Sequence, residues 1–335
     1  MTTAIRTEDL VKSFAGTPAV RGVSLEVPAG SVLGVLGPNG AGKTTTVRML
    51  STLLRPDGGR AEILGHDVVR EARAVRSLIG LTGQYAAVDQ DISGWENLYL
   101  VGRLTGLGRR GARARADEML ERFRLTEAGG RAAGGYSGGM RRRLDIAVSL
   151  VGSPRVLFLD EPTTGLDPRS RNELWDEVRA LAAAGTTVLL TTQYMEEAEA
   201  LADSLVVIDR GRVIASGGTA ELRARVGGQV LRVVPEDPGQ LPEVRRVLAG
   251  CGAGEAQLDE AAGHVQVPLS GEGGGALTAA VRALGAAGIP VAGVNTHVPS
   301  LDEVFLTLTG ADAGADAGAG AGSGAHDDET TRSAA

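Results

Sequence analysis

The chain has 335 residues, and its 43% hydrophobic and 22% charged residues are typical of a soluble globular protein. This length allows two domains of roughly 150 residues each. The formal net charge of −7 argues against a general nucleic-acid-binding protein, and the single cysteine, Cys251, excludes an intrachain disulfide framework. Neither a signal peptide nor an apolar run of membrane-spanning length is apparent, so we expect a cytoplasmic protein.

Two strands are expected before the first informative motif. Residues 5–14 partly alternate apolar and polar side chains, which predicts an edge strand, and residues 19–27 read as a second strand. Phe14 ends the first strand, and its ring either stacks on a nucleobase or belongs to the core. The residues alone leave these two interpretations equally weighted.

The most informative stretch is a glycine-rich loop between an apolar run at 32–36 and helix-compatible residues at 46–50, the context of a phosphate-binding P-loop. Its glycines let backbone N–H groups point at phosphate oxygens, and the following helix adds its positive dipole end. We expect Lys43 to reach the β- and γ-phosphates and the Thr44 hydroxyl to coordinate Mg²⁺. The predicted nucleoside triphosphate site comprises Gly37, Pro38, Asn39, Gly40, Ala41, Gly42, Lys43, Thr44 and Thr45.

Residues 78–82 form the next expected buried strand, and Gln84 follows it as a polar side chain able to touch a metal ion or a water. Residues 93–125 then show a helical, arginine-rich pattern. Such arginines are compatible with a nucleic-acid or lipid surface, but neighbouring acidic residues favour an ordinary solvated helix face.

Two further segments carry groups suited to a triphosphate. Residues Ser137, Gly138 and Gly139 open a helix expected at 141–150, and an N-cap serine with uncovered N–H groups makes a second anion-binding helix terminus. Residues 155–159 indicate a strand buried on both faces that ends in two carboxylates. Because ligands bind at the carboxyl ends of such strands, we expect Asp160 to hold Mg²⁺ and Glu161 to be the general base for an attacking water.

The following elements complete an α/β pattern. A turn at Asp167 leads into an amphipathic helix at about 169–184, and a buried strand at 186–192 ends in Gln193. A helix at 195–203 and a hairpin-like pair at 204–217 follow. Strands that alternate with helices predict a mostly parallel sheet with helices on both faces.

The composition shifts beyond about residue 227. Short strand-like pieces at 230–234, 264–267 and 291–294 flank a helix at 276–287, which predicts a small α+β domain. We expect an ATP-binding domain at residues 1–226, a C-terminal accessory domain at 227–310, with its last ordered piece at 299–310, and a disordered Gly/Ala-rich tail at 311–335.

Taken in order, these motifs make residues 5–225 resemble the ATP-binding subunit of ABC transporters. The resemblance implies an α/β P-loop NTPase fold with a RecA-like core, an antiparallel β subdomain and a helical signature subdomain. It also implies a head-to-tail homodimer that sandwiches two ATP molecules and reopens on hydrolysis.

The resemblance assigns roles by position. Phe14 corresponds to the base-stacking aromatic, and Gln84 to the residue that couples Mg²⁺ to the membrane partner. Residues 137–139 match the signature segment that binds the γ-phosphate of the ATP held by the other copy, and Asp167 matches the dimer-contact loop.

A closer resemblance is to the drug-resistance ATPases typified by the daunorubicin exporters of actinomycetes. It rests on Tyr85, on Tyr-Ser-Gly-Gly-Met at 136–140, on residues 191–198 and on Ser-Leu-Asp-Glu-Val-Phe at 300–305. This subfamily works with a separate ABC-2 type permease, which implies a peripheral protein on the cytoplasmic face of the membrane. The C-terminal domain is then expected to support assembly with the permease.

Two positions depart from the general family pattern. Tyr136 and Met140 stand where Leu and Gln are commoner, and Gln193 replaces the histidine at the γ-phosphate switch position. A glutamine donates a hydrogen bond but does not become cationic near neutral pH. We therefore expect competent but slow hydrolysis through Glu161 and Lys43.

Three alternatives stay open. A soluble ABC ATPase of DNA repair or translation would carry a long coiled-coil insertion or two ATPase units, and neither is present in this sequence. A nucleotide-binding regulator without turnover is disfavoured by the intact acidic pair at 160–161. Export of a lipid or a polysaccharide is the nearest rival to drug efflux, because the permease contacts the substrate.

Overall fold

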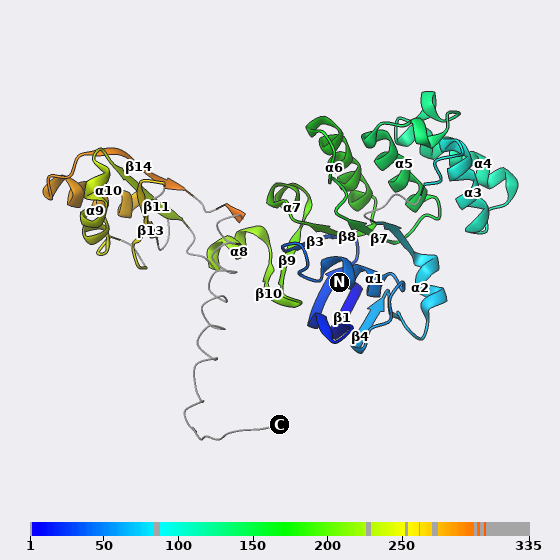
Figure 1. Cartoon of the computed structure of the whole chain (residues 1–335), viewed down its shortest axis with the longest axis horizontal. Coiled ribbons are helices and arrows are strands. Elements are labelled where there is room, and N and C mark those ends of the chain that lie inside the picture. The colour runs from blue at the N-terminus through cyan, green and yellow to red at the C-terminus, as the bar shows by residue number, and fades with distance from the viewer. Residues whose placement is uncertain are drawn as a thin grey trace, which may run out of the picture.

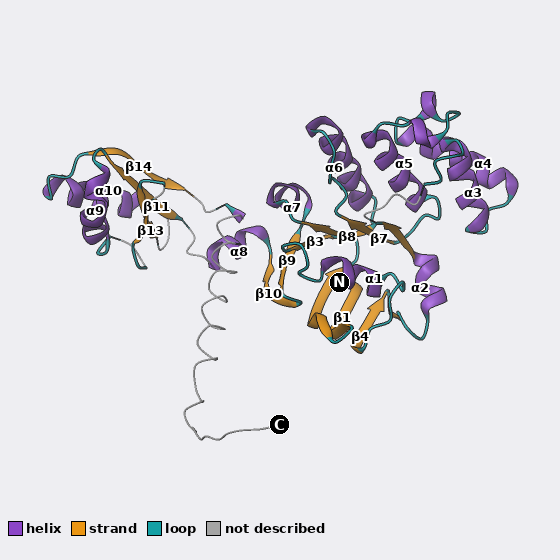
Figure 2. Ribbon diagram, in the orientation of Figure 1, coloured by secondary structure: helices purple, strands orange, loops and turns teal. Residues whose placement is uncertain are grey.

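The computed structural model describes residues 2–83, 88–225, 229–251, 254–260, 262–269, 274–297, 300–301 and 305. These residues form three sheets, of which two lie together and the third lies to one side of them (Figures 1 and 2). None of the helices in these ranges combines the length and the hydrophobicity needed to cross a membrane.

The central sheet has six strands in the order β10-β9-β3-β8-β7-β6. Neighbouring strands are parallel except for the antiparallel pair at one edge, so the expected mostly parallel sheet is confirmed. Every residue of the three middle strands β3, β8 and β7 is buried, as both-face coverage by other layers requires. The strands are β3 (Val32–Leu36), β6 (Ile79–Thr82), β7 (Val156–Asp160), β8 (Thr187–Thr192), β9 (Ser204–Asp209) and β10 (Arg212–Gly217).

The second sheet is antiparallel, in the order β2-β1-β4-β5. It contains β1 (Thr3–Phe14), β2 (Thr17–Pro28), β4 (Gly58–Ile63) and β5 (His66–Asp67). The prediction of an edge strand at residues 5–14 is wrong, because β1 pairs with β2 on one side and with β4 on the other. Its alternation reflects one face packed on the core and one face in water, a pattern that antiparallel strands show at any position.

Two hydrophobic clusters cover the opposite faces of the parallel sheet. Val156 and Phe158 on β7 face a cluster that includes the antiparallel sheet and α1 (Lys43–Leu50). Leu157 and Leu159 of the same strand face a cluster built from the helices on the other side. This alternation follows from the two-residue period of a strand. Helix α1 lies between the two sheets (Figure 1).

The far face of the parallel sheet carries two groups of helices. The helices α6 (Pro168–Ala183) and α7 (Met195–Leu201) lie above the strands, and α3 (Gly94–Leu104), α4 (Arg109–Arg122) and α5 (Gly138–Leu150) gather at one end (Figure 1). A capping box of Ser93 and Glu96 starts α3. Helix α5 begins three residues earlier than expected, because the Ser137 side chain caps it by accepting from the Met140 N–H at 3.2 Å. The short helices α2 (Ala72–Leu78) and α8 (Thr219–Arg225) complete this part of the chain.

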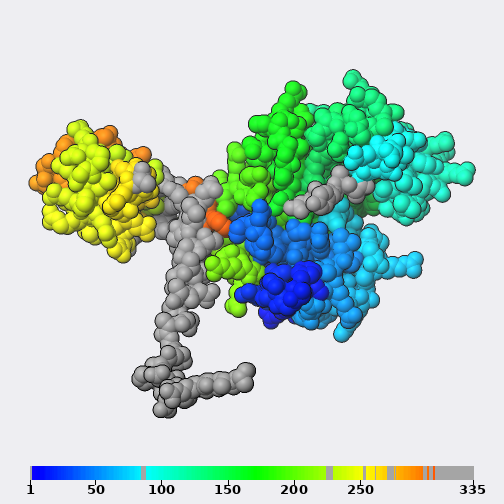
Figure 3. Space-filling view, in the orientation of Figure 1, coloured from blue at the N-terminus to red at the C-terminus, as the bar shows by residue number. Residues whose placement is uncertain are grey.

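A small α+β unit, here called the C-terminal unit (residues 229–297), lies apart from the other two sheets (Figure 3). Its antiparallel sheet has the order β12-β13-β11-β14 and is covered by two helices, one of which, α9, was not expected from the sequence. The elements are β11 (Val230–Pro235), α9 (Leu241–Leu248), β12 (Gln257–Asp259), β13 (His264–Pro268), α10 (Gly274–Ala286) and β14 (Val291–His297). The predicted tail at 311–335 lies outside the described residues.

After this unit the chain returns to the six-stranded sheet. Leu301 is 2% exposed and belongs to a cluster with Met195 on α7 and Leu222 on α8, and Phe305 packs against the same cluster. The Leu301 backbone N–H lies 3.4 Å from a carboxylate oxygen of Glu199. The described residues of the 300–305 motif therefore contact the part of the chain that contains the six-stranded sheet, called the large domain below.

Candidate functional site

The glycine-rich loop connects β3 to α1 at the carboxyl end of the parallel sheet. Gly42 is the N-cap of α1 and has φ +106°, a left-handed conformation that a side chain would strain. A Cβ atom there would also lie 2.5 Å from the carbonyl oxygen of Ala19, and one on Gly37 would lie 2.2 Å from that of Ile208. The loop thus threads between two other strands with no room for side chains at these positions.

Lys43 is the first residue of α1, and its side chain turns back over the loop. The ammonium group donates to the carbonyl oxygens of Gly37 at 2.7 Å and Pro38 at 3.1 Å, and it lies 3.7 Å from a carboxylate oxygen of Glu161. Burial lowers the pKa of Lys43, and the carboxylates of Glu161 and Asp160 oppose this shift. Lys43 is 4% exposed, and its ammonium group lies over the loop where phosphate oxygens would bind.

Asp160 ends β7, and it meets two hydroxyl groups from neighbouring elements. Its Oδ1 accepts from Thr44 at 3.1 Å and from Thr191 at 2.5 Å. The parallel register pairs Asp160 with Thr191, which explains why residues from α1, β7 and β8 converge. A carboxylate and a hydroxyl beside a phosphate-binding loop are hard oxygen donors of the kind that Mg²⁺ selects, so this donor set fits that ion.

Glu161 follows the strand in an unusual backbone conformation. Its φ of +48° lies in the left-handed region, which costs a non-glycine residue about 1–3 kcal/mol. The Glu161 N–H donates to the backbone oxygen and the side-chain hydroxyl of Thr191, both at 3.1 Å. The side chain is 9% exposed and points its carboxylate toward Lys43, so the strained residue brings the expected general base to the triphosphate loop.

Gln193 directly follows β8, whose last residue, Thr192, pairs with Leu36 at the start of the same loop. The register therefore places Gln193 at the sheet edge shared by the loop and the acidic pair. Phe14 is 48% exposed at the end of β1, with the Lys12 amine 5.8 Å from its ring centroid. This exposure does not fit the alternative of a core phenylalanine.

The signature segment lies elsewhere, at the N-terminus of α5. Ser137 and Gly138 are exposed, and a Cβ on Gly139 would lie 2.7 Å from the Ser170 hydroxyl oxygen. Ser170 donates in turn to Asp167 at 2.7 Å, and this hydrogen bond is the main cause of the lowered pKa of that carboxyl. Asp167 also caps α6, so the signature segment and the Asp167 turn form one exposed surface.

Two charged residues that sequence reasoning did not select lie beneath the site. Arg142 on α5 donates to backbone oxygens at the ends of β6 and β7, among them those of Gly83 at 2.7 Å and Asp160 at 3.1 Å. Glu197 on α7 is 1% exposed and accepts from the Trp175 indole at 3.3 Å, and burial raises its pKa. Their only sequence signal is a charge on the buried face of an amphipathic helix.

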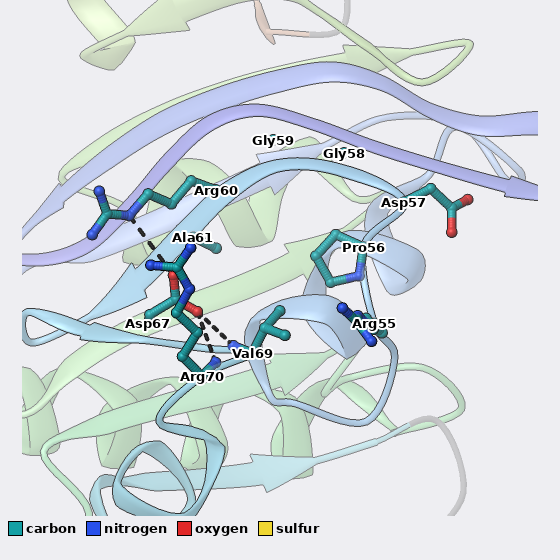
Figure 4. Close-up of a pocket in the computed structure, with 10 residues that line it drawn as sticks. All are labelled: Arg55, Pro56, Asp57, Gly58, Gly59, Arg60, Ala61, Asp67, Val69 and Arg70. Atoms are coloured by element: carbon teal, nitrogen blue, oxygen red, sulfur yellow. Dashed lines mark hydrogen bonds and ion pairs between the residues drawn. The ribbon is translucent and has the colours of Figure 1, made fainter.

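Two predicted residues and one cavity do not belong to the group of site residues described above. Gln84 and Tyr85 lie outside the described residues. A cavity of about 370 Å³ is lined by Arg55, Arg70 and residues of the β4–β5 hairpin, where Asp67 accepts from the backbone N–H groups of Val69 and Arg70 (Figure 4). None of the predicted site residues lines that cavity.

Comparisons with known proteins agree with this geometry. The family profile described as "ABC transporter" matches residues 20–164. The chain is 54% identical to a daunorubicin resistance ATP-binding protein of Streptomyces coeruleorubidus, over 92% of this chain and 95% of the relative. It is 43% identical to the Nod factor export ATP-binding protein I of Ralstonia nicotianae, over 74% of this chain and 77% of that protein. A solved ATP-binding cassette of an ABC transporter in its ADP conformation superposes with a TM-score of 0.61 and 28% identity, over 66% of this chain and 93% of that one.

Proposed function

This chain belongs to the ATP-binding proteins of ABC transporters, and we propose that it hydrolyses ATP to drive efflux of a drug-like small molecule through a separate ABC-2 type permease. The observation that carries the substrate class is the extent of the similarity to the daunorubicin resistance protein. That similarity covers 92% of this chain, whereas the solved ATP-binding cassette covers only 66%. The likeness therefore extends well beyond the ATPase cassette shared by transporters of many kinds.

Different residues of the site bind the phosphates, hold the metal ion and accept the proton in ATP hydrolysis. The loop N–H groups and Lys43 bind and orient the β- and γ-phosphates, because the loop backbone and the amine converge on the same space. Thr44 and Asp160 would hold Mg²⁺, which supplies positive charge to the phosphate oxygens. Glu161 accepts the proton of the attacking water, and Gln193 donates a hydrogen bond to the γ-phosphate.

A second copy of the chain supplies the remaining groups. Ser137, Gly138 and Asp167 are exposed at the starts of α5 and α6, whereas the loop after β3 leads into α1. In a head-to-tail pair, this surface of one copy would cover the triphosphate on the loop of the other. The exposed Phe14 ring then stacks on the adenine at the outer end of each site.

The permease provides the membrane contact. A peripheral position on the cytoplasmic face, and a role of the C-terminal unit in assembly with the permease, are part of the proposal. They rest on the likeness to drug-resistance ATP-binding proteins, which includes the C-terminal part of the chain. The domain limits at 226 and 310 belong to it as well. Export of a lipid or a polysaccharide is the second candidate, because one of the relatives is named for the export of a different cargo, the Nod factor.

The test compares the full-length chain with its Glu161→Gln variant, and with Glu118→Gln as a control on the exposed face of α4. We expect Mg²⁺-dependent ATP hydrolysis by the wild type and the control. Loss of the general base lowers the rate by about 10²–10⁴-fold, and Glu161→Gln then accumulates an ATP-bound dimer.

Cargo is tested by producing the chain together with an ABC-2 type permease in a drug-sensitive host. Raised resistance to daunorubicin, abolished by Glu161→Gln, supports drug efflux. ATP turnover without any change in drug sensitivity supports the second candidate. ATP binding without turnover, even with permease in lipid, would instead indicate a nucleotide-binding regulator.

A further inference from the structure

The guanidinium group of Arg142 joins three separate segments beneath the acidic pair. It makes five hydrogen bonds to partners among the described residues, and its side chain is 12% exposed. The acceptors are the backbone oxygens of Gly83 (2.7 Å), Pro162 (2.8 Å), Asp160 (3.1 Å) and Glu161 (3.2 Å), and a carboxylate oxygen of Asp145 (3.4 Å). Four of the five partners are therefore backbone atoms at the ends of β6 and β7.

These bonds bear directly on the conformation of Glu161. Thr191 on β8 holds the N–H of Glu161, and Arg142 on α5 holds its C=O, so both peptide groups that flank the residue are fixed. The left-handed φ of +48° is unfavourable for a glutamate and persists only where the surroundings enforce it. Thr191 constrains the N–H side of Glu161. On the C=O side, Arg142 makes the shorter of two contacts, since the Thr164 N–H also donates to that oxygen, at 3.4 Å.

The planar fork of arginine is what allows one side chain to reach so many acceptors. A lysine would keep the positive charge near Asp145, which is 2% exposed. Its three N–H donors, however, all sit on one nitrogen and do not reproduce the planar fork. Burial raises the pKa of the Glu197 carboxyl, and the Arg142 charge acts in the opposite direction. Replacing Arg142 by lysine therefore changes the hydrogen-bond geometry and keeps the positive charge.

Arg142 lies on the same helix as the signature segment. Gly138 and Arg142 are four residues apart, so they share one face of α5 about one turn, roughly 6 Å, from each other. A displacement of α5 as a rigid body therefore moves the guanidinium and the peptide groups that it holds. The helix terminus that would face a partner copy in the proposed dimer is in this way connected to the carboxylate of Glu161 in its own chain.

We propose that Arg142 is a positioning residue for hydrolysis: it holds Glu161 in its reactive orientation and makes that orientation depend on the position of the signature helix. This inference rests on the proposed function of Glu161 as the general base. It goes beyond that function, because it assigns the control of the base to a residue on α5, outside the phosphate-binding loop and the acidic pair.

The test uses full-length chains carrying Arg142→Lys, with Arg143→Lys as the matched control. Arg143 is the next residue of α5, but it donates to the Phe123 oxygen at 3.2 Å and pairs with Glu173, both away from β7. Misplacing a catalytic group by about 1 Å costs about 10²-fold in rate. We therefore expect Arg142→Lys to lower kcat about 10- to 100-fold with KM for ATP within threefold of wild type, and the control to leave both unchanged.

A second measurement separates positioning from folding. If Arg142 acts through Glu161, slowed hydrolysis lets the ATP-bound dimer of Arg142→Lys accumulate on size exclusion, as for Glu161→Gln. The double variant Arg142→Gln/Asp145→Asn removes both charges together, so a decrease in kcat at unchanged thermal stability supports the same role. A purely structural residue would lower the yield and stability of the fold and would not trap a dimer.

Two outcomes would overturn the inference. One is an Arg142→Lys variant that hydrolyses ATP within threefold of wild type while Glu161→Gln is inactive. The other is a slow Arg142→Lys variant that stays monomeric with ATP while Glu161→Gln dimerises. Both leave the proposed ATPase activity intact. That activity is refuted by a different result, in which the wild type does not hydrolyse ATP even with permease in lipid and Glu161→Gln does not form the dimer.

Discussion

Thr191→Val is the most informative single substitution near the acidic pair, because it removes one hydroxyl and nearly preserves the shape of the side chain. The hydroxyl donates to Asp160 at 2.5 Å and accepts from the Glu161 N–H at 3.1 Å. The N–H keeps its bond to the Thr191 backbone oxygen, so the main loss is one hydrogen bond to a carboxylate that is 3% exposed.

A hydrogen bond to a charged group contributes about 1.5–3 kcal/mol to stability. For a domain of this size, each kcal/mol shifts the melting temperature by about 2–4 °C. We therefore expect Thr191→Val to melt about 3–12 °C below the wild type in differential scanning calorimetry. Because Asp160 loses a fixed orientation as well, the Mg²⁺ concentration for half-maximal ATPase activity should rise severalfold.

Thr187→Val provides the control on the same strand. Thr187 is also buried, and its hydroxyl accepts from the Gly30 N–H at 2.9 Å, at the end of β8 remote from the acidic pair. It should lower the melting temperature without changing the Mg²⁺ dependence. If both variants shift the Mg²⁺ dependence equally, or if Thr191→Val shifts neither quantity, the assignment of Asp160 as an oriented metal ligand is refuted.

Three further predictions concern single positions. Gly42→Ala should abolish binding of a fluorescent ATP analogue, since its Cβ would collide with the Ala19 oxygen at a left-handed φ; retained affinity would contradict the close approach. Tyr136→Phe should cost about 0.5–1.5 kcal/mol in chemical unfolding without slowing turnover, because it removes the 2.8 Å hydrogen bond to the Ala128 oxygen, which keeps its 2.9 Å bond from the Arg131 N–H; an unchanged midpoint would argue against a contribution of the Tyr136 hydroxyl. Burial raises the pKa of Glu197 in the folded state. Its contribution to stability therefore falls as the pH rises from 4.5, the ordinary pKa of a glutamate, through the folded pKa. Glu197→Gln should gain thermal stability relative to wild type across that range, and a difference that stays constant from pH 4 to 8 would contradict the raised pKa.

The sequence is informative where a function needs neighbouring residues. The loop at 37–45 and the strand that ends in Asp160 and Glu161 each carry their whole signal within ten residues, and the parallel sheet follows from their alternation with helices. The convergence of Thr44, Asp160 and Thr191 follows in turn from parallel register, which places the carboxyl ends of strands at one edge.

Features that depend on distant residues were not predictable in this way. Alternation in β1 reports which face is buried and does not report how many neighbours the strand has, so its central position was missed. Arg142 sits in a run of three arginines, and only the fold distinguishes the one that points at β7 from the next one, which points at Phe123. Tyr136 fits its place because Gly94 leaves room for its hydroxyl, a relation between residues 42 positions apart.

The return of Leu301 to the large domain affects the order in which the protein can be completed during synthesis. Leu301 fills the same hydrophobic cluster as Leu36, at the start of the glycine-rich loop, and Leu222, at the end of the large domain. Residues 226–300 emerge from the ribosome before that cluster can close, which takes roughly 4–15 seconds at about 5–20 residues per second. The C-terminal unit thus lies between two segments that contribute to one hydrophobic cluster, and a nascent chain that stops before residue 301 exposes an apolar surface beside α7.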